Sequence, residues 1–119
     1  MARTVDQDHV FELQNAAMSA LAAGRHDAAR ATFAEATRLS GQVLPPTDPV
    51  RLALAGAHAD AWFEHWDDSD QALVIARTAY DDAVFAIDDA PEQQYRDAVR
   101  ELSQLRDQMT FWAFRMSSS

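Results

Sequence analysis

Two acidic side chains and two histidines are crowded into residues 58–65, a segment with the apolar periodicity of a helix. Asp60 and Glu64 are four positions apart and therefore share one helix face, whereas His58 and His65 share another. A hard cation or a ligand amine could lie between the two carboxylates, with a histidine beside them. The segment lacks the His-Glu-x-x-His spacing of a helical zinc site, however, and metal sites usually take ligands from several elements. Because a solvated acidic face explains the same residues, the sequence predicts no catalytic residue, no metal site and no cofactor.

Aromatic side chains are concentrated in this predicted helix and in the last helix of the chain. We expect most of them in the core, since large aromatic side chains are usually buried there. Any that stay exposed would form an apolar surface of the kind that marks a partner or a self-association site. The residues concerned are Trp62, Phe63, Trp66, Phe111, Trp112 and Phe114.

The charge balance is strongly acidic. The net charge is −9, and all ten basic residues are arginines. Nucleic acids and anionic membrane surfaces require a basic face, so the sequence excludes both as expected partners. A neutral or basic protein partner is compatible with this charge.

Cysteine content and hydropathy limit the possible chemistry and the expected cellular location. The chain has no cysteine, which excludes disulfides, thiolate metal sites and a cysteine nucleophile. No apolar run approaches the roughly 20 residues that a membrane helix needs, and no apolar signal segment opens the chain. A cytoplasmic location is therefore the expectation.

Helical periodicity runs through the chain without an alternating strand pattern. Gly24 and Gly41 are expected to end the first two helices, and the Pro45–Pro46 pair prevents the second from continuing. Thr47 or Asp48 can cap the third helix. The predicted helices span residues 7 to 23, 26 to about 40, 49 to about 66, a cap within 67–70 to about 87, and 91 to about 115.

Short connections make neighbouring helices antiparallel. The fold class predicted is therefore all-α, with five antiparallel helices arranged as stacked pairs. A chain of 119 residues should form one domain, with a core at about 6–115 and tails at 1–5 and 117–119.

An internal similarity supports helix pairing. The pattern Ala29-x-x-x-Phe33-x-x-Ala36 recurs as Ala76-x-x-x-Tyr80-x-x-Ala83. Alanines beside one aromatic ring let two helices approach closely, an arrangement that resembles tetratricopeptide repeats. Convergence of two alanine-rich amphipathic helices explains the pattern equally well.

Two segments carry a more specific resemblance. Residues 44–55, LPPTDPVRLALA, and residues 104–112, QLRDQMTFW, resemble the C-terminal half of the 14-3-3 family. The similarity runs from about Ala31 to Trp112. The resemblance implies a shortened 14-3-3-like domain with a concave, peptide-binding face, and thus a protein-interaction module rather than an enzyme.

The resemblance also indicates which residues would contact a peptide. Glu64, Phe111 and Trp112 match positions that line the family's groove, and Gln108 stands at one of its two peptide-holding asparagines. Ala57 stands at the other asparagine and keeps no amide. The predicted peptide-binding set is Asp60, Glu64, Gln104, Gln108, Phe111 and Trp112.

The phosphate-binding positions of the family are changed. Its arginine–tyrosine pair would fall near Ala16 and Ala17, and no arginine lies between Val5 and Gly24. A carboxylate about 4 Å from a phosphate would disfavour binding by on the order of 4 kcal/mol per unit charge near a protein surface. Asp60 and Glu64 therefore predict peptide binding that is independent of phosphorylation.

Three functions remain open from the sequence. The leading one is a non-enzymatic module that binds a neutral or basic peptide or protein. The first alternative is a structural homo-oligomer or accessory subunit, including a homodimer through the exposed first or last helix. The second alternative is a small enzyme or cation-binding protein that uses Asp60, Glu64 and a histidine.

Overall fold

A computed structural model describes residues 3–118 and confirms the all-α prediction. Met1, Ala2 and Ser119, which belong to the predicted tails, lie outside the described residues. The described part contains five α-helices and one short 3-10 turn. They are α1 Val5–Ala22, α2 His26–Val43, α3 Pro49–Glu64, α4 Ser69–Ala86, the turn η1 Ile87–Asp89 and α5 Glu92–Ser117.

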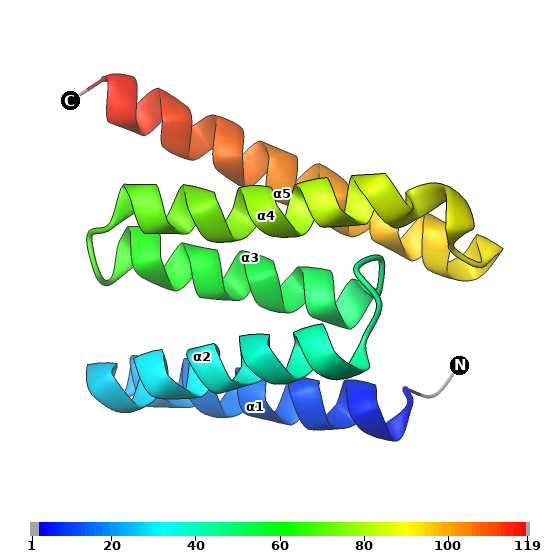
Figure 1. Ribbon diagram of the computed structural model, residues 1–119. Helices are drawn as coiled ribbons and strands as arrows, with labels where there is room; N and C mark the ends of the chain where they lie inside the picture. The colour runs from blue at the N-terminus through cyan, green and yellow to red at the C-terminus, as the bar shows by residue number, and fades with distance from the viewer. Residues whose placement is uncertain (1–2, 119) are drawn as a thin grey trace.

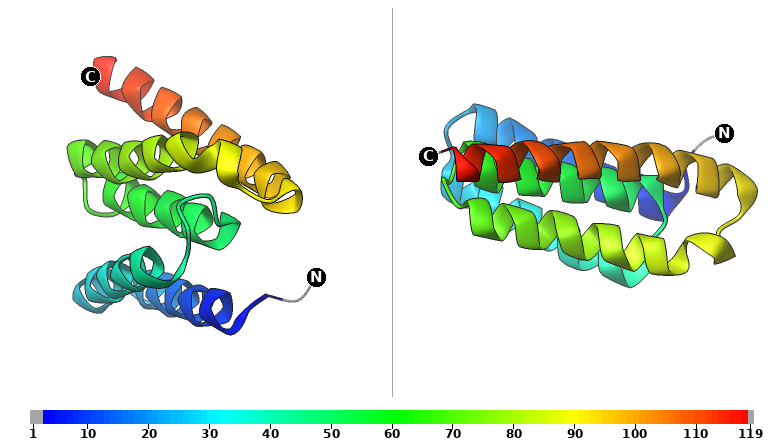
Figure 2. Two further views of the ribbon diagram at one scale, coloured as in Figure 1. Left: turned by 45° about the vertical axis from the view of Figure 1, so that its right-hand side comes forward. Right: turned by 90° about the horizontal axis from the view of Figure 1, so that it is seen from above.

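The helices stack in two layers. Helices α1, α3 and α5 form one layer, and α2 and α4 form the other (Figures 1 and 2). Successive helices run antiparallel, and α3 contacts all four other helices. Because α3 is central, different faces of it border separate hollows.

Capping groups explain where the first two helices begin and end. Thr4 caps α1 through a reciprocal pair of hydrogen bonds with Gln7, so the helix starts two residues before its predicted start. Gly24 adopts a φ of +78° and ends this helix as expected. The expectation for Gly41 is wrong, since α2 continues through it to Val43. A glycine costs only about 1 kcal/mol inside a helix, whereas the prolines that follow prevent helix formation outright.

Aspartates set the next two helix starts. Asp48 accepts a hydrogen bond from the Val50 backbone N–H at 2.8 Å and so caps α3. Asp68 accepts one from the Gln71 N–H and caps α4. Pro91 stands just before α5, at its N-cap, rather than in the first turn.

Two apolar clusters make up the core, and each contains residues of α3. One is formed mainly by α3, α4 and α5 and contains Trp112, Leu105, Leu102 and Leu52. The other joins α1 and α2 to the opposite face of α3. It contains Val10, Ala17, Phe33, Ala36, Leu44, Leu54 and Ala61. Alternate faces of one helix thus hold the two halves of the molecule together.

None of the helices in the described residues combines the length and apolarity that crossing a bilayer would require.

Candidate functional site

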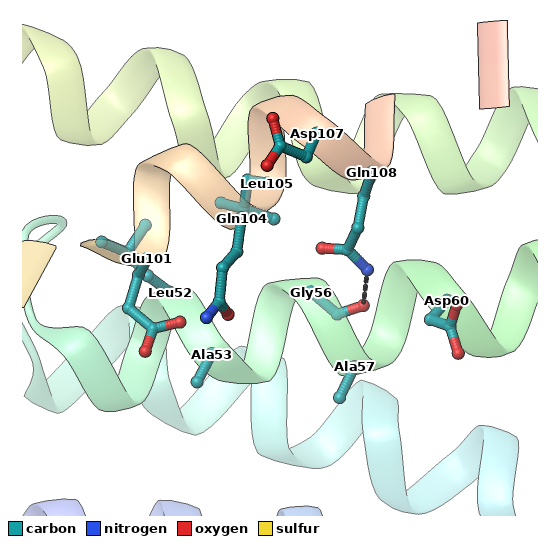
Figure 3. A pocket seen from close by; sticks show the side chains of 10 residues that line it. All are labelled: Leu52, Ala53, Gly56, Ala57, Asp60, Glu101, Gln104, Leu105, Asp107 and Gln108. Carbon is teal, nitrogen blue, oxygen red and sulfur yellow. Dashed lines mark hydrogen bonds between the residues drawn. The ribbon is translucent and has the colours of Figure 1, made fainter. Parts of the chain in front are cut away.

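A hollow of about 450 Å³ lies between α3 and α5 (Figure 3). We refer to it as the α3–α5 groove. Alanines and a glycine of α3 make its floor, and polar side chains of α5 extend over it. The lining residues are Leu52, Ala53, Gly56, Ala57, Asp60, Glu101, Gln104, Leu105, Asp107 and Gln108.

The structure brings together three of the predicted binding residues. Asp60, Gln104 and Gln108 all line the groove. Glu101 and Asp107 line it as well, and neither was among the predicted residues. The spacing of 101, 104 and 108 follows the helical period, which is the signal that could have revealed Glu101.

Gln108 bridges the two helices. Its side-chain Nε2 donates a hydrogen bond to the Gly56 carbonyl oxygen at 3.3 Å (Figure 3). A Cβ at position 56 would lie only 3.0 Å from the Gln108 Oε1. The missing side chain at Gly56 therefore lets the Gln108 amide lie flat against α3.

Carboxylates lie at the two ends of the groove, Asp60 at one and Glu101 at the other (Figure 3). Partial burial raises the pKa of Asp60 above its usual value, and the neighbouring Glu64 raises it further, against the opposing effect of His65. Burial likewise raises the pKa of Glu101. Each carboxylate thus lacks part of its hydration, and a cation would compensate that loss.

The other predicted contacts lie elsewhere. Trp112 is 2% exposed and stacks on Phe63 in the core, with ring centroids 5.3 Å apart, so it forms no wall of the groove. Phe111 is half exposed beyond the groove, with the Arg115 guanidinium 5.6 Å from its ring centroid. Glu64 is exposed one helical turn beyond Asp60 and does not line the hollow.

His58 faces the opposite side of α3, inside the core. Its Nε2 accepts a hydrogen bond from Trp62 Nε1 at 3.2 Å, so its Nδ1 carries the proton and donates to Thr37 Oγ1 at 2.9 Å. The ring also stacks on Phe33, with centroids 5.2 Å apart. Burial lowers the pKa of His58 to about 4, so this histidine is a neutral structural group.

The structure offers no support for a cation site. The buried His58 ring points away from Asp60, and His65 lies beside the ring of His26. Within residues 3–118, no three acidic or histidine side chains are grouped closely enough to hold a metal ion.

Three arginines, Arg51, Arg77 and Arg106, line other hollows. Arg51 donates to the Leu44 carbonyl at 2.7 Å and lines a hollow on the other side of α3. Arg77 and Arg106 line one between α4 and α5. Among the residues described, those bordering the α3–α5 groove include no arginine.

Comparison with known proteins identifies the class to which this fold and groove belong. The 14-3-3 protein family profile matches residues 14–113, most of the chain. The chain therefore belongs to the 14-3-3 family.

Individual relatives agree with this assignment. The chain is 37% identical over 86 residues to 14-3-3 protein 3 of Entamoeba histolytica, covering 72% of this chain and 36% of that protein. Human 14-3-3 protein eta is 34% identical over 86 residues, covering 72% and 35% of the two chains. The 14-3-3 protein homolog of Encephalitozoon cuniculi is 37% identical over 84 residues, covering 71% and 32%. The chain thus spans about a third of the length of these curated relatives.

Proposed function

We propose that this chain is a protein-interaction module that binds neutral or basic peptide segments in the α3–α5 groove without requiring a phosphate. The observation that carries the proposal is the lining itself: amides in the middle, a carboxylate at each end and no guanidinium group among the lining residues described. Membership of the 14-3-3 family supports a protein-binding role.

The amides suit the backbone of an extended peptide. The side chain of Gln104 projects between α5 and α3 (Figure 3), where its amide can both donate to and accept from a peptide group. Gln108 uses its nitrogen to bond Gly56, which leaves its Oε1 as an acceptor for a peptide N–H. Two amides on one helix face would thus fix the direction and register of a bound segment.

The carboxylates set the preference in charge. An arginine or lysine side chain can pair with Asp60 or Glu101, and the interaction strengthens where the carboxylate is already partly desolvated. A phosphoserine brings nearly two negative charges into the same space and meets repulsion instead. We infer that basic residues, rather than phosphorylated ones, anchor the partner.

An unbiased selection tests this proposal. A display library of random, unphosphorylated peptides is panned against the protein, and the expected outcome is enrichment of lysine and arginine at fixed spacing. The double variant Asp60→Asn/Glu101→Gln should lose this enrichment. The matched variant Asp6→Asn/Glu92→Gln, at exposed positions outside the groove lining, should keep it. Equal enrichment on both variants would contradict the proposal.

A homodimer through α5 is the second candidate function. Its supporting observation is the exposed aromatic surface of Phe111 and Phe114, which are 49% and 67% exposed near the C-terminal end of α5. Sedimentation analysis of the wild type and of the Phe111→Ser/Phe114→Ser variant distinguishes the two candidates. A wild type that stays monomeric at high concentration would remove the dimer and leave the peptide-binding proposal standing.

A further inference from the structure

Another hollow, of about 310 Å³ and open to solvent, lies between α4 and α5, on a different side of α5 from the groove. Two arginines on different helices line it, Arg77 from α4 and Arg106 from α5. Tyr80 and Thr110 also line it, as does one carboxylate, Asp81. We refer to this site as the α4–α5 hollow.

Both arginines have hydrogen-bonding capacity to spare. Arg77 forms no ion pair or hydrogen bond within the part of the chain that the structure covers. The nearest carboxylate oxygen to Arg106 is that of the adjacent Asp107, 3.9 Å from its Nε and beyond hydrogen-bond distance. By contrast, Arg38 pairs with Glu35, and Arg51 bonds to a backbone carbonyl. Arg77 and Arg106 therefore both keep guanidinium donors that a ligand could use.

The net charge of the lining residues favours an anion with a single negative charge over one with two. Among the lining residues themselves, two arginines and one aspartate carry one net positive charge. A carboxylate neutralises this charge, whereas a phosphate monoester would bring nearly two negative charges beside Asp81. A planar carboxylate also matches the fork of a guanidinium group, and it can accept from two groups at once.

The remaining lining fits an organic acid rather than a bare ion. The Tyr80 hydroxyl makes no hydrogen bond within residues 3–118 and can donate to a carboxylate oxygen. The side chains of Met109 and Ala113, together with the Tyr80 ring, provide apolar surface for the rest of the molecule. Thr110 is already committed, since its hydroxyl donates to the Arg106 carbonyl at 2.9 Å.

We propose that the α4–α5 hollow binds the carboxylate of a compact organic acid, with Arg77 and Arg106 donating to its two oxygens. A free acid and an acidic side chain of a peptide offer the same chemistry. This site is separate from the α3–α5 groove and stands or falls independently of the function proposed there.

Titration with benzoate, followed by NMR of the arginine Nε–Hε resonances, tests the proposal. We expect saturable shifts of the Arg77 and Arg106 resonances, with a dissociation constant on the order of 1–10 mM for so small a ligand. The resonance of Arg96, which pairs with Glu92 at 3.4 Å, should stay in place. Benzamide, the uncharged analogue, should cause no saturable shift.

Variants separate a specific site from general attraction. Arg77→Gln and Arg106→Gln should each weaken benzoate binding by about tenfold, and Arg96→Gln should leave it unchanged. All three positions are exposed, so these substitutions should leave the protein folded. An unchanged unfolding midpoint for each variant checks this. A short peptide with one glutamate tests the source: tighter binding than benzoate identifies a peptide carboxylate, and weaker binding identifies a free acid.

Three results would overturn the assignment. The first is a linear, non-saturating response to benzoate, and the second is equal weakening by Arg96→Gln and Arg77→Gln. The third is tighter binding of inorganic phosphate than of benzoate, because the charge-matching argument requires the opposite order.

Discussion

The two hollows beside α5 differ in charge although they share a helix. The α3–α5 groove presents Glu101, Gln104 and Gln108 from α5, whereas the α4–α5 hollow presents Arg106 and Thr110 from the same helix. Successive residues in a helix point about 100° apart, so acidic and basic side chains that alternate in sequence separate onto different sides. A net charge of −9 therefore does not make every surface of this domain acidic. The comparison predicts two sites with opposite ligand preferences.

Removing the side chain that anchors α5 should have the largest effect, because both hollows depend on the position of this helix. Trp112→Ala deletes a side chain that is 2% exposed and packed against Phe63. The expected loss is about 3–5 kcal/mol of unfolding free energy, measured by urea denaturation. Phe114→Ala, at a position 67% exposed, is the control and should change stability by less than about 1 kcal/mol. Similar losses for the two variants would show that α5 is held differently.

Stability should depend on pH in opposite ways for the buried His58 of α3 and for the carboxylates that line the groove. His58 has a pKa of about 4 when folded, against an ordinary value of 6.5 for histidine, so the unfolded state binds more protons between these pH values. Its contribution is complete above pH 6.5 and falls as the pH drops towards 4, by about 3 kcal/mol in total. The groove carboxylates act in the opposite direction, because their raised pKa values make the folded state bind protons more readily.

Urea denaturation between pH 7 and pH 4 measures the His58 effect. His58→Phe keeps the stacking on Phe33 but cannot titrate, so its stability should fall less than that of the wild type over this range. The control is His26→Phe, at an exposed position. If the wild type and His58→Phe lose equal stability between pH 7 and pH 4, His58 is not a buried neutral imidazole.

Removing the charged side chains of one hollow at a time tests whether the two hollows bind their ligands independently. Asp60→Asn/Glu101→Gln should weaken the binding of a basic peptide by about tenfold and leave benzoate binding unchanged. Arg77→Gln should weaken benzoate binding and leave the binding of the basic peptide unchanged. Isothermal titration of both ligands against both variants measures the four affinities. Loss of both ligands in either variant would mean that the two sites are one, or that the variant has disturbed α5.

Gly56→Ala should have the smallest effect on stability and a local effect on the groove. Alanine favours the helix by about 1 kcal/mol, but its Cβ would displace the Gln108 amide and remove one hydrogen bond of similar value. We expect a net change within about 1 kcal/mol, together with a shift of the Gln108 side-chain amide resonance. Gly41→Ala, in open space on α2, is the matched control and should leave that resonance in place.

Much of the fold followed from the sequence because proline and aspartate act locally. Asp48, Asp68 and the prolines after Leu44 mark helix ends through their own backbone chemistry, so no tertiary information was needed. Gly41 misled because a glycine only weakens a helix, and packing of the flanking residues compensates for that weakness.

The site was harder to predict because its members depend on helix rotation. Phe111 and Trp112 are adjacent, so they cannot both face the groove, and only the structure shows that the tryptophan turns into the core. Glu101 is part of α5 and lines the groove between α5 and α3. Its helical spacing from Gln104 and Gln108 was the available signal, but spacing alone does not show that the carboxylate is partly buried. Gln108 was named from the family resemblance, and it lines the groove together with Gln104, one helical turn earlier on α5.

We propose that the α3–α5 groove recognises a segment by its positive charge and not by a phosphate. The most direct test is isothermal titration of one basic peptide selected on this groove, in two versions that differ only in a serine or a phosphoserine beside its anchoring basic residue. We expect the phosphorylated version to bind at least about fivefold more weakly, and Asp60→Asn/Glu101→Gln to reduce this difference. Tighter binding of the phosphorylated version would contradict it.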